Sequence, residues 1–166
     1  DAGLRVRSVD RKSSLAAAVL YLEADNWQGI TALEDEQGNV ISTSLVTARA
    51  AIESRGFELE GKTQLTDSLL LMANLGVVDA EYTDFAGRGA GQVIGSPVKL
   101  IPEYDGNLSL RWQIGGGWFV RGEVTFLGAM PLDAGIRLGF DVDAQDEQDA
   151  VEIYGLQACW APERFS

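Results

Sequence analysis

The chain has 166 residues, with 25 acidic and 13 basic side chains and a formal net charge of −12. This length favours one domain with a sizeable core, and the acidity argues against a nucleic-acid partner, since phosphates require a basic patch. The chain contains no histidine and a single cysteine, Cys159. It therefore lacks the commonest catalytic base and metal ligand, and it cannot form an internal disulfide or a cysteine zinc cluster.

Alternation of apolar and polar residues recurs along the chain and predicts β-strands. In chain order the predicted strands cover residues 3–9, 14–25, 45–65, 69–83, 107–114, 118–127 and 151–160. No apolar run approaches the ~18 residues that a membrane helix needs. The opening residues already read as a strand, so we expect that a leader has been removed or that the chain starts inside a larger protein.

The predicted connections are alternately short and long. Short polar or glycine-rich turns follow the first, third and fifth strands, and the "GGG" of 115–117 exploits the freedom of glycine at positive φ. Long loops are expected at about 26–44, 86–104 and 128–150. We interpret residues 1–166 as a single β-barrel segment.

Alternation defines two faces of a sheet without saying which one is inside. In a soluble sandwich or barrel the apolar face forms the core, whereas in a membrane barrel it faces lipid. The predicted strands are longer than the five or six residues typical of soluble proteins, and long loops alternate with tight turns. Aromatic residues also gather near strand ends, as in membrane barrels. These features favour an all-β, antiparallel, up-and-down transmembrane barrel of about seven or eight strands, possibly part of a larger barrel.

Four segments resemble a known family. They are "LRVRSVDRKSSLAAAVLYLEADNWQ" (4–28), "ARAAIESRGFELEG" (48–61), "LTDSLLLMANLGVVDAEYTDF" (65–85) and "IPEYDGNLSLRW" (101–112). Their succession and spacing resemble the C-terminal part of the β-barrel of TonB-dependent outer-membrane receptors. The stretch 128–150 matches this pattern least well.

The resemblance implies uptake of a scarce nutrient, such as a ferric siderophore, across the outer membrane of a Gram-negative bacterium. The implied partners are membrane lipid, the remaining barrel strands or other chains of an outer-membrane assembly, and TonB acting through a plug. Neither a plug domain nor a TonB box is recognisable in this sequence, and the family barrel has 22 strands. The implied role of the chain is structural, with no catalytic residues and no cofactor.

If the apolar face meets lipid, the opposite face lines the barrel lumen. The predicted lumen-facing residues, called here the polar set, are Arg5, Arg7, Glu58, Glu60, Lys62, Gln64, Asn74, Arg111, Gln113, Arg121 and Glu123. Opposite charges on this face are expected to pair, as Arg121 with Glu123. The set could contact a plug or a passing ligand, or it could be a solvated interior with balanced charges.

Two alternatives stay open. A small self-closed outer-membrane pore or structural barrel would need an even number of strands, and a soluble β-sandwich or barrel binding module would bury the apolar face.

Other motifs carry weaker signals. The acidic run Asp141, Asp143 and Asp146 offers hard oxygen ligands for calcium but lacks the EF-hand spacing, so an exposed acidic loop is the preferred interpretation. Residues 34–36 receive the same interpretation. "GRGAGQ" (87–92) lacks the lysine and the helix of a phosphate loop, and Cys159 is expected to be a small packed residue.

Overall fold

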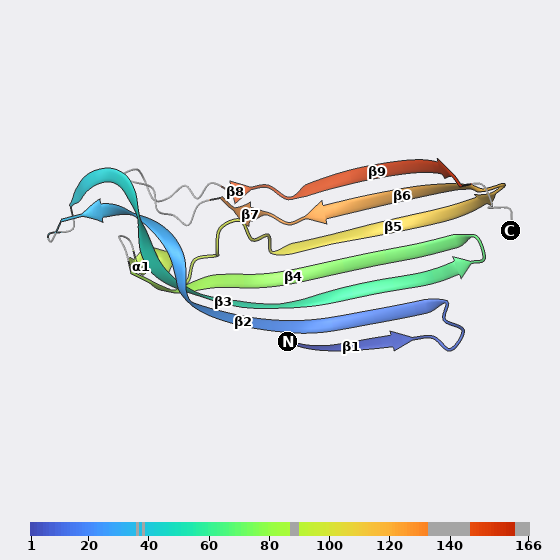
Figure 1. The fold of residues 1–166 in the computed structure, drawn as a ribbon, viewed down its shortest axis with the longest axis horizontal. Coiled ribbons are helices and arrows are strands. Elements are labelled where there is room, and N and C mark those ends of the chain that lie inside the picture. The colour runs from blue at the N-terminus through green and yellow to red at the C-terminus, as the bar shows by residue number, and fades with distance from the viewer. Residues whose placement is uncertain (36, 38, 87–89, 133–146, 162–166) are drawn as a thin grey trace.

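The computed structural model describes the chain except for residues 36, 38, 87–89, 133–146 and 162–166, and for 29–34, 40–48, 90 and 92 it describes the backbone alone. The described strands form a seven-stranded antiparallel sheet in the order β1-β2-β3-β4-β5-β6-β9, with a separate two-stranded sheet of β7 and β8. Sequence neighbours are neighbours in space throughout the main sheet (Figure 1). The predicted all-β, up-and-down fold is confirmed.

The main strands are long, as the alternating pattern predicts. Their bounds are β1 (Ala2–Arg7), β2 (Ser13–Glu34), β3 (Val40–Thr66), β4 (Leu69–Phe85), β5 (Tyr104–Gly115), β6 (Trp118–Leu127) and β9 (Val151–Trp160). The short elements are α1 (Ala90–Val93), β7 (Met130–Pro131) and β8 (Glu147–Gln148). Among the described residues, no helix has the length and apolarity to cross a membrane.

Tight turns connect the strands at one end of the sheet, on the right in Figure 1. The β1–β2 turn is closed by the Ser8 amide, which donates to the Ser13 carbonyl at 2.9 Å, and Arg11 in this turn has a φ of 59°. The β5–β6 turn places Gly115, Gly116 and Gly117 at φ values of 112°, 59° and 81°. Residues with a Cβ rarely adopt these angles, which explains the glycine run.

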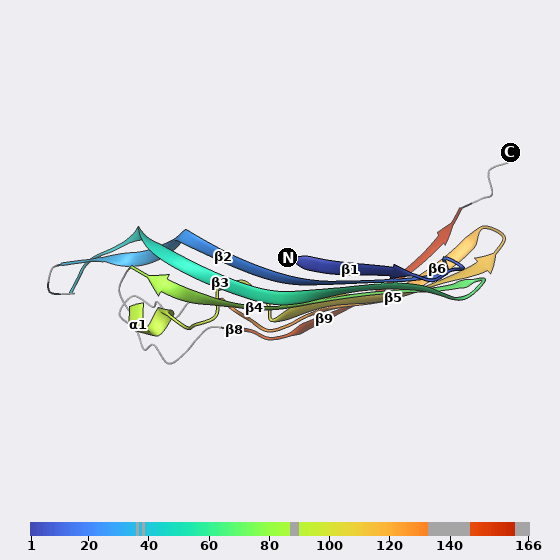
Figure 2. The same cartoon turned by 90° about the horizontal axis from the view of Figure 1, so that it is seen from below.

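The long connections lie at the opposite end, with one correction. A loop was predicted over 26–44, but β2 continues to Glu34 and β3 begins at Val40, so most of this stretch is a β-hairpin. Strand pairing uses backbone groups, which polar side chains do not prevent. A register shift between Ala24 and Trp27 interrupts the ladder, and Asn26 takes a φ of 58° there. The hairpin extends beyond the other strands (Figure 2).

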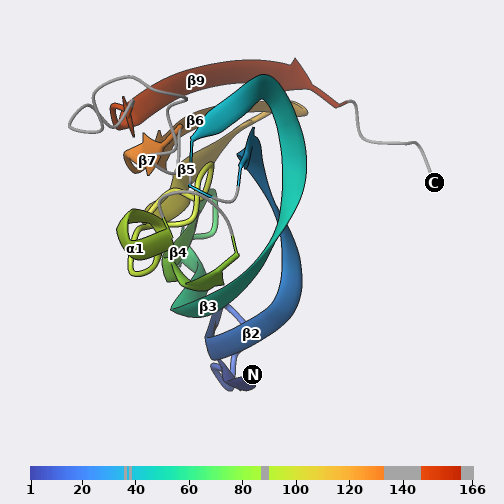
Figure 3. The ribbon, with the colours of Figure 1, turned by 90° about the vertical axis from the view of Figure 1, so that its left-hand side faces the viewer.

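The main sheet is a single curved layer, as the end view of Figure 3 shows. Within the described residues, β1 and β9 are its two edges and do not pair with each other. The described sheet is therefore not the small self-closed barrel of the first alternative. The only other described sheet is the two-stranded β7–β8 pair, so the second layer that a soluble sandwich requires is not among the described elements.

Candidate functional site

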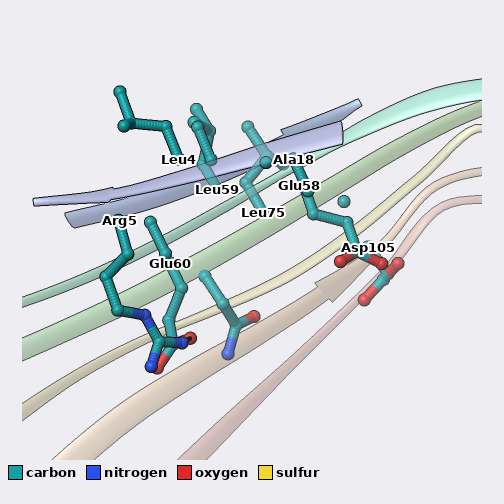
Figure 4. A pocket seen from close by; sticks show the side chains of 13 residues that line it. Leu4, Arg5, Ala18, Glu58, Leu59, Glu60, Leu75 and Asp105 are labelled. Atoms are coloured by element: carbon teal, nitrogen blue, oxygen red, sulfur yellow. Dashed lines mark ion pairs between the residues drawn. The ribbon is translucent and has the colours of Figure 1, made fainter. Parts of the chain in front are cut away.

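Strand register divides the sheet into two faces, because directly paired residues point to the same side. Figure 4 shows Leu4, Leu59 and Leu75 on one side of the strands and Arg5 and Glu60 on the other. The first side is called here the apolar face. Its members include Leu4, Val6, Leu15, Ala17, Val19, Phe57, Leu59, Leu71, Ala73, Leu75, Val77, Leu108, Leu110, Trp112, Val120, Val124 and Phe126.

Large side chains of the apolar face are exposed rather than packed into a core. Leu15 is 55% exposed, Leu108 is 44% exposed and Trp112 is 52% exposed. Soluble monomers rarely leave a continuous apolar surface of this extent open. The exposure of these side chains therefore indicates that the apolar face contacts another apolar surface or lipid.

The apolar face has a defined width along the strands. On β4 it runs from Leu69 to Val77, and these residues lie directly opposite Trp112 and Tyr104 of β5. This matches the nine to eleven residues that a tilted strand needs to cross a bilayer, or a band about 20–25 Å tall.

Beyond Val77 the same side of the sheet becomes charged. Asp79 lies opposite Arg55, and Glu81 lies opposite Glu53, which in turn lies opposite Glu23. The Arg55 Nε donates to Glu53 at 2.6 Å. This charged row ends the apolar face on the side of the long connections.

Aromatic side chains mark both borders of the apolar face. Trp118 and Trp160 lie near the tight turns with ring centroids 6.4 Å apart, and the Trp160 indole donates to the Gly116 carbonyl at 3.1 Å. At the other border Tyr21 is 55% exposed and Tyr104 is 37% exposed. Such rings suit a boundary between hydrocarbon and water.

The polar set lies together on the opposite face, across β1, β3, β4, β5 and β6. Register places the members in shared rows. In one row, Ala16 of β2 lies between Arg5 and Glu60, and Glu60 lies directly opposite Asn74. In another row, Arg111 lies directly opposite Arg121. We call this side the polar face.

Contacts on the polar face balance several of these charges. Arg121 pairs with Glu123 at 2.7 Å, as the sequence predicts, and the Arg5 guanidinium lies 3.7 Å from the Glu60 carboxylate. The Arg111 guanidinium lies 4.0 Å from the centre of the Phe119 ring. This cation–π contact stabilises the charge of Arg111 beside the like-charged Arg121. The Arg5–Glu60 pair is largely exposed and the Arg121–Glu123 pair is partly exposed, so each ion pair stabilises the fold only weakly.

The sequence analysis missed two polar-face residues. Asp105, at the start of β5, lines a hollow of about 710 Å³ with Arg5, Glu58, Glu60 and Asn74 (Figure 4). Ser109 is 1% exposed, and its hydroxyl has no hydrogen-bond partner. The predicted strand began at residue 107, and within it only the longer polar side chains were selected. Extending the alternation of β5 by one pair would have found Asp105.

At the end with the long connections, a small core covers the polar face. Ile52 and Tyr82 occupy polar-face positions of β3 and β4, and both are 4% exposed beneath Val93 of α1 and Val98. The Val98 amide donates to the Ala80 carbonyl at 2.9 Å, so the chain after α1 is hydrogen-bonded to β4. This segment therefore covers the part of the polar face that lies nearest the long connections.

The weak calcium candidates Asp141, Asp143 and Asp146 lie outside the described residues. Among the described residues, no group of three or more histidine, cysteine or acidic side chains could hold a metal ion. Cys159 is partly buried on β9, opposite Phe119.

An antiparallel sheet with an exposed apolar band, aromatic borders and a polar reverse face defines a class: the wall of a transmembrane β-barrel. The family model "TonB dependent receptor-like, beta-barrel" matches residues 1–161. The chain therefore belongs to the TonB-dependent receptor β-barrel family, and the family predicted from its motifs is confirmed. Members of this family are outer-membrane proteins of Gram-negative bacteria.

Two solved structures share the fold. The ferric yersiniabactin uptake receptor FyuA from Yersinia pestis superposes with a TM-score of 0.67 at 19% identity, over 95% of this chain and 21% of that one. The copper transporter OprC superposes with a TM-score of 0.69 at 14% identity, over 98% of this chain and 22% of that one. The chain thus spans about a fifth of each.

Proposed function

We propose that this chain forms part of the barrel wall of a TonB-dependent transporter in the outer membrane of a Gram-negative bacterium. The observation that carries the proposal is the exposed apolar face, which has the width of a bilayer and aromatic side chains at both borders. In this arrangement the apolar face meets hydrocarbon, and the polar face lines the lumen.

The two ends of the sheet suggest an orientation. Outer-membrane barrels have short periplasmic turns and longer extracellular loops. The turn at Gly115–Gly117 accordingly lies on the periplasmic side, and the β2–β3 hairpin and α1 lie outside the cell. The charged row around Arg55 then sits at the outer border of the membrane.

The open edges of the sheet require partners. An unpaired strand edge in hydrocarbon leaves backbone groups without hydrogen bonds, at a cost of several kcal/mol for each group. We therefore assign β1 and β9 to pairing with further strands, from the same polypeptide or from other chains. Related barrels of 22 strands provide such neighbours.

The cargo is a scarce nutrient of the metal-carrying type. FyuA takes up ferric yersiniabactin and OprC transports copper, and both share the fold of this wall. The polar face, with Arg5, Glu58, Glu60 and Asp105 around its hollow, offers contacts to a plug or to a passing ligand. TonB would act through that plug, so the function is energised uptake rather than catalysis.

Fractionation and uptake measurements test this proposal on the intact protein. We expect it to partition with the outer membrane, to need detergent for extraction, and to migrate differently on gels before and after heating. Uptake of an iron or copper complex should depend on both this protein and TonB. Recovery of the protein in plain buffer would contradict the membrane assignment, and TonB-independent uptake would contradict the transport mechanism.

A further inference from the structure

A second hollow lies on the apolar face rather than on the polar one. It is a groove of about 560 Å³, and its lining includes Val6, Leu15, Gly61, Leu71 and Ala73. Register places Val6, Leu15, Gly61 and Ala73 in one row across β1, β2, β3 and β4. The groove exists because Gly61 of β3 and Ala73 of β4 are small, whereas the groove-lining leucines Leu15 of β2 and Leu71 of β4 are large.

The glycine in this row keeps the groove open. A Cβ added at Gly61 would meet only the Leu15 Cδ1 atom, at 3.9 Å. Gly61 is therefore required neither for a close backbone approach nor for an unusual backbone angle. The effect of glycine at this position is to leave space between Leu15 and Leu71 on a surface where aliphatic side chains would fit.

One end of the groove is polar. Ser8, Ser13 and Thr63 line it there, and the hydroxyls of Ser13 and Thr63 are 2.7 Å apart. The adjoining tight turns carry an exposed ion pair, with the Lys12 ammonium 3.4 Å from the Asp67 carboxylate. A cation and an anion thus lie next to the point where the apolar groove ends.

We propose that this groove binds a single phospholipid with a zwitterionic, primary-ammonium headgroup, such as phosphatidylethanolamine. This inference rests on the proposed function, because it requires the apolar face to meet lipid. One acyl chain lies over Gly61 and Ala73. The ester and phosphate oxygens accept one hydrogen bond from the Ser13–Thr63 hydroxyl pair, which has one proton left to donate, and others from the Lys12 ammonium, and the lipid ammonium pairs with Asp67. Charge complementarity at the turns and the apolar lining together define this occupant.

Lipid titration of the intact, delipidated protein in detergent tests the proposal, with bound phosphatidylethanolamine counted by native mass spectrometry. The Gly61→Leu variant fills the groove, and we expect it to weaken the tightest binding event about tenfold, the effect of losing roughly two buried methylene contacts. Gly61→Ala should have a smaller effect in the same direction, which covers the case in which the leucine variant does not fold. Lys12→Gln should weaken binding about two- to fivefold, as for an exposed charged contact.

Ala17→Leu is the matched control. Ala17 lies on the same face and opposite Leu59, outside this groove. Its variant should bind phosphatidylethanolamine like the wild type. Equal binding by the wild type, Gly61→Leu and Ala17→Leu would overturn the proposal, and unchanged binding by Lys12→Gln would overturn the headgroup assignment. A change of oligomeric mass in Gly61→Leu would assign the groove to a second copy and also overturn it.

The proposed function fails by a different result. If the wild type were recovered without detergent, the membrane assignment itself would be wrong. If the wild type is inserted in membranes and Gly61→Leu binds the lipid normally, only the groove assignment is wrong.

Discussion

A single arginine at the centre of the apolar face gives the most informative perturbation. Leu108 lies opposite Ala73, midway between the border residues Tyr104 and Trp112 of β5, and its side chain is 44% exposed. If this surface meets hydrocarbon, Leu108→Arg places a guanidinium near the bilayer midplane. The stability of this variant therefore tests both the depth of Leu108 in the bilayer and which face of the sheet meets lipid.

The expected cost follows from this depth. An arginine on the lipid face costs about 2–4 kcal/mol at the midplane and about 0–1 kcal/mol near the interfaces. Leu108→Arg should therefore lower the folding equilibrium constant by about 30- to 1000-fold, and Val77→Arg, at the border, by about fivefold at most.

Asn74→Arg provides the matched control on the polar face. Asn74 is exposed and lies directly opposite Glu60, which would give a new guanidinium an anionic partner. This variant should stay within about 0.5 kcal/mol of the wild type. Denaturant unfolding of the intact protein in phospholipid vesicles, followed by the heat-sensitive gel shift, measures all three. Equal costs for Leu108→Arg and Asn74→Arg would refute the assignment of the faces.

Three further variants test local contacts. Gly106→Ala should lose about 1–3 kcal/mol of stability in denaturant unfolding, because its Cβ would lie 2.4 Å from the Phe126 ring. In the control variant Gly122→Ala the new Cβ would have no atom within 4 Å, so its stability should change little. Equal effects of the two variants would contradict this packing. Ile52→Ala should destabilise the packing of residues 93–103 against the sheet by about 2–5 kcal/mol and so expose these residues to proteases. An unchanged digestion pattern would contradict the packing of this segment on Ile52. The Ser8 hydroxyl and the Lys12 amide hold the pKa of Asp10 below its usual value of 3.8. The resulting stabilisation of the turn is present above that value and is lost as pH falls through the lowered pKa, and Ser8→Ala should raise the Asp10 pKa in a carboxyl-carbon NMR titration.

Alternation in the sequence was sufficient to predict the seven main strands and their two faces, apart from the extension of β2 and β3 into 26–44. From Phe57 to Leu65 and from Leu69 to Val77, side chains at every second position share one chemistry, and one turn fixes how the two strands pair. Since side-chain direction has period two, the positions of Glu58, Glu60 and Asn74 on a common face followed from the sequence.

Features that depend on other contacts could not be predicted in this way. The hairpin over 26–44 is held by backbone pairing, to which its polar composition gives no clue. Ile52 and Tyr82 read as ordinary members of alternating strands, and nothing local indicates that Val93 and Val98 cover them. The groove at Gly61 depends on which residues become neighbours across four strands.

Adjacent labels on β3 test the central claim most directly. In a Cys159→Ser background, Leu59→Cys and Glu60→Cys each carry an environment-sensitive fluorophore on the intact protein in vesicles that contain nitroxide-labelled lipid. Leu59 is 39% exposed on the apolar face, and Glu60 lies on the polar face with its side chain 70% exposed. We predict that the lipid quenches the label at Leu59 strongly and the label at Glu60 weakly. Strong quenching at Glu60 with none at Leu59 would contradict the assignment of the apolar face to the membrane.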